Sequence, residues 1–482
     1  MNFNSIEFVV LFVATIALYY SPLCKRRSFQ ILILLAASAI FYAWSTPSLL
    51  FLLGGSCIWN ALCTERIIFW KFIKEDDKKA KSILIWAVCI NLILLMFFKY
   101  AGFIAVQLFG DLITSGISQW LVEIPLPIGI SFYTFQGISL LIDTYRKDLD
   151  DEQLTKLSGT GKNRYAATRD ISFYIIFFPQ LVAGPIVKAR EFVSQIGYKQ
   201  YCNIEWVTAV KLMILGYFLK IVVADNIAEQ TIVLTQPWLQ SLSSIDAIIL
   251  LYGYSLQIFA DFAGYSLIAI GLANMFGYKL PINFNFPYNS TSITEFWQRW
   301  HISLSSWLRD YLYIPLGGNR KGSKRTYINL FLVMFLGGLW HGAAWKFLIW
   351  GAMHGVFLAL ERLFNRNKKE TSSIRSILGW IYTFHVVTLL WLTFLMPSMD
   401  QIILYFKVLS NGFHLHGPTI FVPVYFGSFV VVYHAIGWFK EHKNLVFNRF
   451  SGGALEGYLY SILLFLILTN SGPPQGFIYF QF

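Results

Sequence analysis

A histidine lies inside an apolar stretch of this chain, where an ionisable side chain is costly to bury. His341 stands in the segment Leu336-Gly-Gly-Leu-Trp-His-Gly-Ala-Ala-Trp345, with basic residues on both sides of the stretch. An ionisable residue at membrane depth is by default a candidate functional site. Because the unperturbed pKa of histidine is about 6.5, its imidazole can act as a general base near neutral pH. We therefore predict that His341 belongs to a functional site.

Three glycines flank this histidine, at positions 337, 338 and 342. Glycines let another helix or a ligand come close, or let a helix break. Irregular backbone at membrane depth is tolerated where it is buried in protein or lines a cavity. The glycines therefore favour a cavity beside His341. The structural alternative is a histidine that hydrogen-bonds a neighbouring helix.

The densest polar region of the chain runs from 283 to 325. From Thr294 onward its pattern predicts one amphipathic helix, with Ser292 or Thr294 as N-cap and Glu295 in the first turn. The residues predicted to share one face are Phe296, Trp300, Ser303 and Trp307, with His301 adjacent to them. Such a helix either lies at the membrane interface, anchored by its tryptophans, or also closes over an active site. We favour the second reading.

Further side chains from the same part of the chain complete the predicted site. Asp261 is a carboxylate in a long apolar segment and needs a lysine, arginine or histidine partner, in an orienting or a purely structural role. Arg309 and Asp310 can pair locally or line a polar cavity. His354 follows His341 by 13 residues, which would turn it to another face of a continuous helix. The remaining candidates are Asn283, Trp297, Arg299 and Trp340.

The elements that must position these residues are membrane helices. The chain has 482 residues, of which 56% are hydrophobic and 13% charged, whereas soluble domains carry about 25% charged residues. We predict an all-α, polytopic membrane protein with about 11–13 membrane segments, forming one domain over 1–482 with its active-site region at about 257–355. The net charge of +12 lies in short loops, which fits the positive-inside rule rather than nucleic-acid binding.

Loop charges also predict the orientation. The basic segments 25–27 and 71–81 fall on the cytoplasmic side, which places the N-terminus outside. The basic segments 319–325 and 361–369 are likewise cytoplasmic, so the chain between them must enter the membrane and return. His341 follows Tyr327 by 14 residues, about 21 Å of helix, and therefore lies well inside a core of about 30 Å. No cluster of histidine, cysteine or carboxylate has metal-ligand spacing, so we predict no metal.

These residues resemble the membrane-bound O-acyltransferase (MBOAT) superfamily, in its bacterial alginate O-acetyltransferase-like branch. The blocks Arg299-Trp-His301 and Leu339-Trp-His-Gly342, in this order, are specific together. The matching segments span nearly the whole chain: 127–135, 177–185, 261–266, 283–288, 296–304, 308–318, 337–343 and 477–480.

The resemblance implies a ring of tilted helices around a thin central region with a funnel on the outer side, in the bacterial inner membrane. It implies that His341 is the catalytic histidine and that His301 matches the second, less certain one. It further implies that acetyl groups from a cytoplasmic donor, acetyl-CoA or another acyl thioester, cross the membrane without a bound cofactor. Extracytoplasmic partner proteins would then place them on a cell-surface polysaccharide such as alginate.

The chemistry of the residues agrees with this expectation. A histidine is suited to remove the proton of an attacking hydroxyl, and donors must stabilise the developing oxyanion or leaving thiolate. We expect His301 to be that donor, with Arg309 as a weaker candidate. Alternatives are peptidoglycan O-acetylation, D-alanyl transfer to teichoic acid, and a non-enzymatic proton-coupled transporter or flippase. The lack of inverted repeats argues against the transporter.

Overall fold

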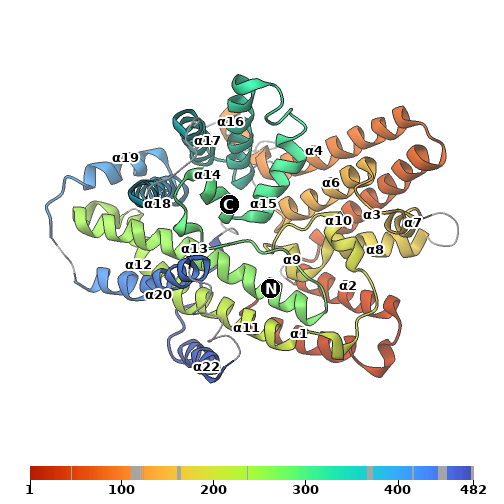
Figure 1. The fold of residues 1–482 in the computed structure, drawn as a ribbon, viewed down its shortest axis with the longest axis horizontal. Helices are drawn as coiled ribbons and strands as arrows, with labels where there is room; N and C mark the ends of the chain where they lie inside the picture. The colour runs from red at the N-terminus through yellow and green to blue at the C-terminus, as the bar shows by residue number, and fades with distance from the viewer. Residues whose placement is uncertain are drawn as a thin grey trace. The chain divides into compact units, whose positions relative to one another are not determined.

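The computed structural model describes residues 1–44, 46–109, 120, 122, 124–159, 164–235, 237–365, 373–414, 417–442 and 453–478. All regular elements within these ranges are helices, which confirms the predicted all-α class (Figure 1). Among the described helices, six are long and apolar enough to cross a membrane: Asp77–Gln107, Trp206–Leu234, Ser244–Met275, Trp345–Phe364, Ser373–Leu395 and Ile420–Glu441. Shorter apolar helices are Ile6–Tyr19, Arg27–Ala43 and Ala454–Thr469. The predicted number of crossings and the ring of helices stay predictions.

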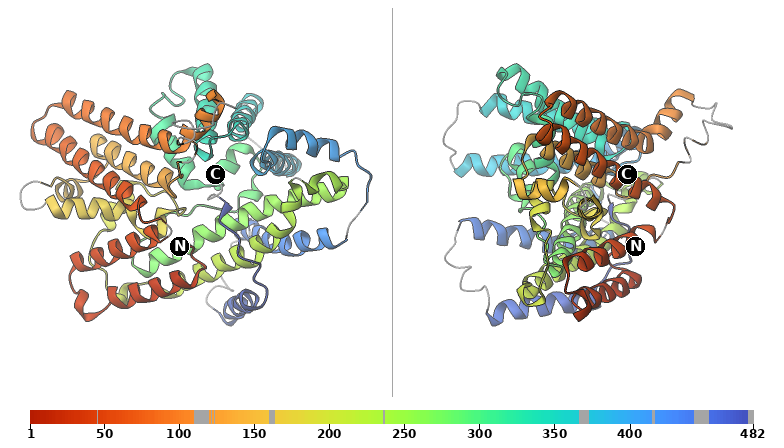
Figure 2. Two further views of the ribbon diagram at one scale, coloured as in Figure 1. Left: turned by 180° about the vertical axis from the view of Figure 1, so that it is seen from behind. Right: turned by 90° about the vertical axis from the view of Figure 1, so that its right-hand side faces the viewer.

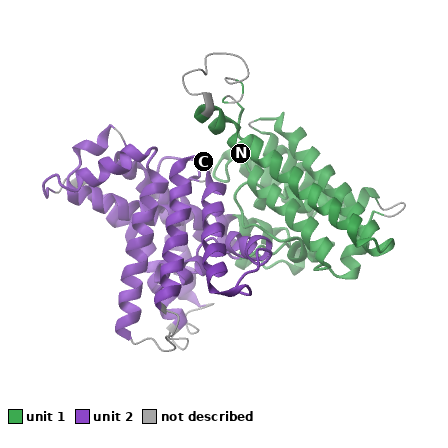
Figure 3. Cartoon of the chain, turned by 90° about the horizontal axis from the view of Figure 1, so that it is seen from above, with its two compact units in different colours: residues 1–209, 269–281 green, residues 210–268, 282–482 purple. Residues whose placement is uncertain are grey.

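The described residues form two compact units (Figure 3). The first comprises residues 1–209 and 269–281, and the second comprises 210–268 and 282–482. The first unit contains α1 (Ile6–Tyr19), α2 (Arg27–Ala43), α3 (Leu49–Ile68), α4 (Asp77–Phe109), α6 (Ile130–Arg146), α7 (Asp151–Leu157), α8 (Arg164–Ile176), α9 (Phe178–Leu181) and α10 (Ala189–Phe192). Helices α1 and α2, drawn in red, lie side by side in Figures 1 and 2.

Polar side chains join the helices of the first unit in its interior. The amides of Asn60 on α3 and Asn91 on α4 exchange hydrogen bonds of 3.3 and 3.1 Å, and both side chains are buried. A Cβ atom on Gly137 of α6 would lie 2.7 Å from the Asn60 amide. This position therefore needs glycine, because a side chain there would displace the asparagine pair.

The second unit holds every candidate site residue. It contains α12 (Asp225–Thr231), α14 (Ile293–Arg299), α15 (Ile302–Leu308), α16 (Gly322–His341), α17 (Trp345–Asn365), α18 (Ser373–Leu395), α19 (Met399–Val408), α20 (Gly417–His442) and α22 (Ala454–Thr469). It also includes most of α11 (Trp206–Tyr217) and of the long helix α13 (Ser244–Met275). Its apolar core is centred on the fully buried rings of Trp300, Trp350 and Trp391.

Helices α16 and α17 form a hairpin joined by three residues. Gly338 and Gly351 face each other across it, since a Cβ atom on either would lie 2.9 Å from the Cα atom of the other. A Cβ atom on Gly355 would likewise lie 3.0 Å from the Cα atom of Phe331. The backbones of α16 and α17 therefore touch along the hairpin, and we call this glycine-lined contact the seam. The two helices are the arms of the hairpin, and His341 lies at the end of the first arm, α16.

Candidate active site

His341 is the last residue of α16. The backbone of Gly342 is extended, at φ −170° and ψ 157°, and α17 begins at Trp345. The helix therefore breaks directly after the histidine. The side chain of His341 is 5% exposed, so the predicted burial is confirmed.

The glycines beside His341 pack against protein. A Cβ atom on Gly338 would clash with the carbonyl oxygen of Phe347, and one on Gly342 would clash with the Phe347 ring. The sequence favoured a cavity at these glycines, and for Gly338 and Gly342 that interpretation is wrong. Their small size instead allows α17 to approach α16, as in tightly packed membrane helices.

Aromatic rings surround the His341 imidazole. The ring centroids of Trp340, Trp350 and Phe394 lie 4.9, 5.1 and 5.4 Å from that of His341. The Trp350 ring stands at 89° to the imidazole. These residues come from α16, α17 and α18, so three helices bury the imidazole among aromatic rings.

His301 lies at a break between two short helices. Its backbone is left-handed, with φ 44° and ψ 53°, and Trp300 before it is extended. The single amphipathic helix predicted from Thr294 is therefore wrong, because the chain turns at His301. The inward face is nevertheless confirmed, since Phe296, Trp300, Ser303 and Trp307 are buried. Ser292 is the N-cap, and its hydroxyl accepts the Glu295 amide at 3.1 Å.

Asn283 fixes the proton of the His301 ring. The Asn283 Oδ1 atom accepts the backbone N–H of Ser303 at 3.2 Å, so this end of the amide is the oxygen. The same oxygen lies 3.0 Å from Nδ1 of His301, which must therefore carry a proton and donate. In the neutral imidazole, Nε2 is then an acceptor.

Burial keeps this imidazole neutral. His301 is 1% exposed, and desolvation lowers its pKa from 6.5 to about 3. Its ring stands nearly perpendicular to that of Phe262, at 4.7 Å between centroids. Trp340 contacts both histidines, with centroids 6.3 Å from His301 and 4.9 Å from His341. The two predicted catalytic histidines thus both lie near one tryptophan ring.

His354 belongs to the same aromatic cluster, contrary to the prediction that it faces elsewhere. Trp297 donates from Nε1 to Nδ1 of His354 at 3.3 Å, and the centroid of the Trp350 ring lies 4.8 Å from that of His354 and 5.1 Å from that of His341. The prediction assumed one continuous helix, whereas the chain reverses after His341. Trp297 therefore joins this aromatic cluster, with its ring centroid 5.6 Å from that of Trp350, and its predicted part in the site stays a prediction.

Asp261 has the cationic partner that the sequence required. Its Oδ1 atom lies 2.7 Å from Nζ of Lys220, which also pairs with Asp225 at 2.7 Å. All three side chains are at most 7% exposed. The sequence interpretation missed Lys220 and Asp225, although a lysine within the apolar run 218–224 was an available signal. One cation and two carboxylates form a buried triad.

The triad binds the C-terminal segment of the described chain. Asp261 Oδ2 accepts the backbone N–H of Ile478 at 2.8 Å, and Lys220 donates to the carbonyl of Gln475 at 3.2 Å. Phe477 stacks on Tyr265 at 4.5 Å and contacts Phe262, the residue against His301. Asp261 therefore supports the site through packed rings rather than by touching either histidine.

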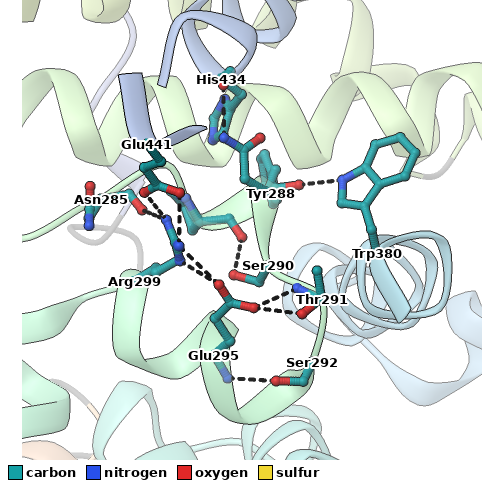
Figure 4. Close-up of polar contacts among 12 residues, drawn as sticks. Asn285, Tyr288, Ser290, Thr291, Ser292, Glu295, Arg299, Trp380, His434 and Glu441 are labelled. Atoms are coloured by element: carbon teal, nitrogen blue, oxygen red, sulfur yellow. Dashed lines mark hydrogen bonds and ion pairs between the residues drawn. The ribbon is translucent and has the colours of Figure 1, made fainter. Parts of the chain in front are cut away.

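The two arginines predicted for the site, Arg299 and Arg309, form ion pairs with carboxylates. Arg309 pairs locally with Asp310 at 2.8 Å and its side chain is 62% exposed, so of the two predicted possibilities it takes the local pair. Arg299 bonds Glu295 at 3.0 Å and Glu441 at 2.6 and 3.1 Å, beside Thr291 and Asn285 (Figure 4). Its contacts connect α14 with the end of α20. Among the described residues, no group of three or more histidine, cysteine or carboxylate side chains could hold a metal ion.

Comparison with known proteins adds independent information. The family profile described as MBOAT, membrane-bound O-acyltransferase family, matches residues 124–371, which include both site histidines. The "Probable alginate O-acetylase AlgI" of Azotobacter vinelandii is 39% identical over 409 residues, covering 83% of this chain and 76% of that protein.

Two relatives act on other polymers according to their names. The "Peptidoglycan O-acetyltransferase" of Helicobacter pylori is 35% identical over 446 residues, covering 87% of this chain and 81% of that protein. The "Teichoic acid D-alanyltransferase" of Bacillus subtilis is 32% identical over 276 residues, covering 54% of this chain and 66% of that protein.

Proposed function

The chain belongs to the membrane-bound O-acyltransferase family and is a multi-pass membrane acyltransferase, and we propose that it moves acetyl groups across the bacterial inner membrane for O-acetylation of an exported polysaccharide. The polysaccharide is alginate-like, because the alginate O-acetylases are 39% identical over most of the chain. The N-terminus is extracytoplasmic in this proposal, as the loop charges predict.

The observation that carries the mechanism is the position of His341, buried among aromatic rings where a helix ends. His341 acts as general base and takes the proton of an acceptor hydroxyl. The hydroxyl oxygen then attacks the thioester carbonyl carbon, the carbon–sulfur bond breaks, and the thiolate leaves and is protonated by the histidine. The dry surroundings protect the thioester from hydrolysis.

We propose a role for His301 that differs from the one predicted from the sequence, which was donation to the oxyanion. Its Nδ1 proton is already committed to Asn283, so its Nε2 atom can accept a hydrogen bond. We propose that it orients a hydroxyl or N–H group near Trp340, which makes it a second acceptor in the site. The oxyanion donor is then another group.

The donor is a cytoplasmic acyl thioester such as acetyl-CoA, and it is a substrate rather than a bound cofactor. Extracytoplasmic acetyltransferase proteins of a polysaccharide modification system receive the acetyl group. Peptidoglycan O-acetylation is the second candidate, favoured by the 35% identity to the Helicobacter pylori protein. D-alanyl transfer is the third, since that relative matches about half of this chain.

The test replaces His341 with glutamine, which keeps a polar side chain but removes the base. Polymer-bound acetate should be lost while the amount of protein in the membrane stays normal. His385→Gln is the matched control, because His385 is an exposed histidine on α18 whose Nδ1 atom lies 2.8 Å from the carbonyl of Ile381 on its own helix. Normal acetylation by the His341→Gln protein would refute the catalytic assignment and leave the transporter alternative.

A further inference from the structure

A groove separate from the His341 cluster opens between α18, α20 and the segment around α14. Its volume is about 1100 Å³, which is large enough for a small-molecule or lipid ligand. The three rings described above around His341, those of Trp340, Trp350 and Phe394, are not among the residues that line it. The groove is therefore a candidate binding site separate from the His341 cluster.

One end of the groove is charged (Figure 4). Arg299 bonds Glu295 through Nε and Nη2, bonds Glu441 through both Nη atoms, and reaches the Asn285 carbonyl at 3.3 Å. Its donors are thus all directed at groups of the protein. Among the charged residues that line the groove, one guanidinium and two carboxylates leave a formal charge of −1, so this end favours a cationic group over a ligand with net negative charge.

The other walls are apolar and exposed. Ile377 and Trp380 of α18 are 57% and 44% exposed, and Val431 and Trp438 of α20 are 59% and 44% exposed. In a multi-pass membrane protein, such walls face lipid chains. Tryptophans are also enriched at the level of the headgroups.

The charged end lies at the level of the membrane interface. Glu441 is the last residue of the apolar span Ile420–Glu441, and α18 begins at Ser373 beside the same end of the groove. Deeper positions of both helices supply the apolar walls. Along its length the groove therefore changes from charged to apolar, as a phospholipid does from headgroup to chain.

We propose that this groove binds a phospholipid with a protonated amine in its headgroup. The ammonium meets the carboxylates of Glu441 and Glu295, and one acyl chain lies between α18 and α20. An anionic phospholipid is disfavoured by the charge of −1. The polyanionic acyl-CoA is disfavoured for the same reason, so the site is distinct from that of the acyl donor. The proposal does not depend on which polymer the enzyme acetylates.

The test measures lipid retention by the purified full-length protein with native mass spectrometry. Phosphatidylethanolamine and phosphatidylglycerol with identical chains are added at equal concentrations. We expect phosphatidylethanolamine to be retained roughly fivefold better, the scale of one charge contact. Equal retention of the two lipids would overturn the proposal. So would displacement of phosphatidylethanolamine by acetyl-CoA, which would assign the groove to the donor.

Two variants localise the effect. Glu441→Gln removes the excess negative charge and should abolish the preference between the two lipids. Ala435→Trp fills the exposed lining with a large ring, leaves the ion cluster intact, and should lower retention of both lipids. The matched control is Glu205→Gln, which alters a carboxylate of an exposed ion pair with Lys279 and should change nothing. Unchanged retention by a folded Ala435→Trp protein would place the lipid elsewhere and refute the groove.

Discussion

Asn283 controls which nitrogen of His301 carries the proton, and this determines what the histidine can do. A single oxygen accepts from His301 Nδ1, from the Ser303 amide and from the Ser303 hydroxyl, at 3.0, 3.2 and 2.9 Å. The opposite end of the amide donates to Ser266 at 3.2 Å. The asparagine is thus held at both ends, and it is a positioning residue for the imidazole.

Replacing Asn283 with alanine should slow acetyl transfer about tenfold or more, because the imidazole loses the partner that fixes its tautomer. The rate of polymer acetylation per amount of membrane protein measures this. Ser266→Ala is the control, since it leaves the bond to His301 in place. Asn283→Asp should retain the acceptor but raise the pKa of His301, and the acid limb of the pH–rate profile should then move upward. An unmoved profile would contradict the positioning role.

The buried His301 also makes the protein sensitive to acid. Its pKa is about 3 in the folded protein and 6.5 in the unfolded chain, so below pH 6.5 the unfolded chain binds a proton that the folded protein does not. The free energy of unfolding is therefore unaffected by His301 above pH 6.5. As the pH falls from 6.5 toward 3, this free energy decreases by about 1.4 kcal/mol per pH unit.

Thermal unfolding in detergent at several pH values between 7.5 and 4.5 tests this. The melting temperature of the wild-type protein should fall more steeply with decreasing pH than that of His301→Gln. Parallel curves would mean that His301 is not buried in its neutral form.

The sequence predicted single residues well where burial itself is costly. His341 and Asp261 stood out because charge is expensive in an apolar segment, and the structure buries both. Lys220 carries the same signal inside the span Trp206–Leu234, but a lysine within a few residues of the end of an apolar run is easily interpreted as an interfacial anchor. The contact of Trp297 with His354 could not be derived, because it depends on how α14 packs against α17.

At the scale of elements, the hairpin of α16 and α17 carries His341. Its seam depends on backbone contact at Gly338 and Gly351, which only glycine permits. Each arm fixes one part of the imidazole's surroundings, since α16 supplies Trp340 and α17 supplies Trp350. A shift of one arm along the other would therefore move the walls of the site.

Gly351→Ala should destabilise the protein and lower acetylation, because the added methyl group would clash with the backbone carbonyl of Met334. The melting temperature in detergent measures the effect. Gly54→Ala is the matched control in another helix, α3, where a Cβ atom meets nothing within 4 Å. It should be neutral or stabilising by up to about 1 kcal/mol, since alanine is the better helix former. An equal effect of both changes would contradict the seam.

Helix breaks limited what periodicity could predict. The spacing of apolar residues after Thr294 correctly identified the inward face, because both short helices keep the same side buried. The break at His301 leaves no trace in hydrophobic spacing, since it arises from a left-handed backbone at a non-glycine residue. The same limitation misplaced His354, whose direction depends on the turn after Gly342.

At the scale of the whole second unit, the triad of Lys220, Asp225 and Asp261 joins α13 to the helical segment that begins with α11. Breaking a buried ion pair by removing one partner typically costs 3–5 kcal/mol, because an uncompensated charge stays behind. Here the removal of Lys220 would leave two buried carboxylates without their cationic partner. The triad is therefore a point where one side chain supports several segments.

Lys220→Met should lower the free energy of unfolding by about 3–5 kcal/mol. The amount of folded protein in the membrane should therefore fall strongly. Adding Asp225→Asn and Asp261→Asn to it should restore much of the loss, because no charge would remain buried. Membrane protein level and melting temperature measure both steps. Lys211→Met, which breaks the more exposed pair with Glu456, should cost at most about 1 kcal/mol. A mild effect of Lys220→Met would show that water reaches the triad.

The attachment of the segment 470–478 has a consequence for biosynthesis. Its bonds to Lys220 and Asp261 join positions 255 and 217 residues apart in the chain. Translation therefore delivers the two carboxylates and the lysine into the bilayer long before the ribosome makes their last partners. Until residue 478 is made, Lys220 and Asp261 lack the backbone partners at Gln475 and Ile478, so this polar cluster can be completed only late in translation.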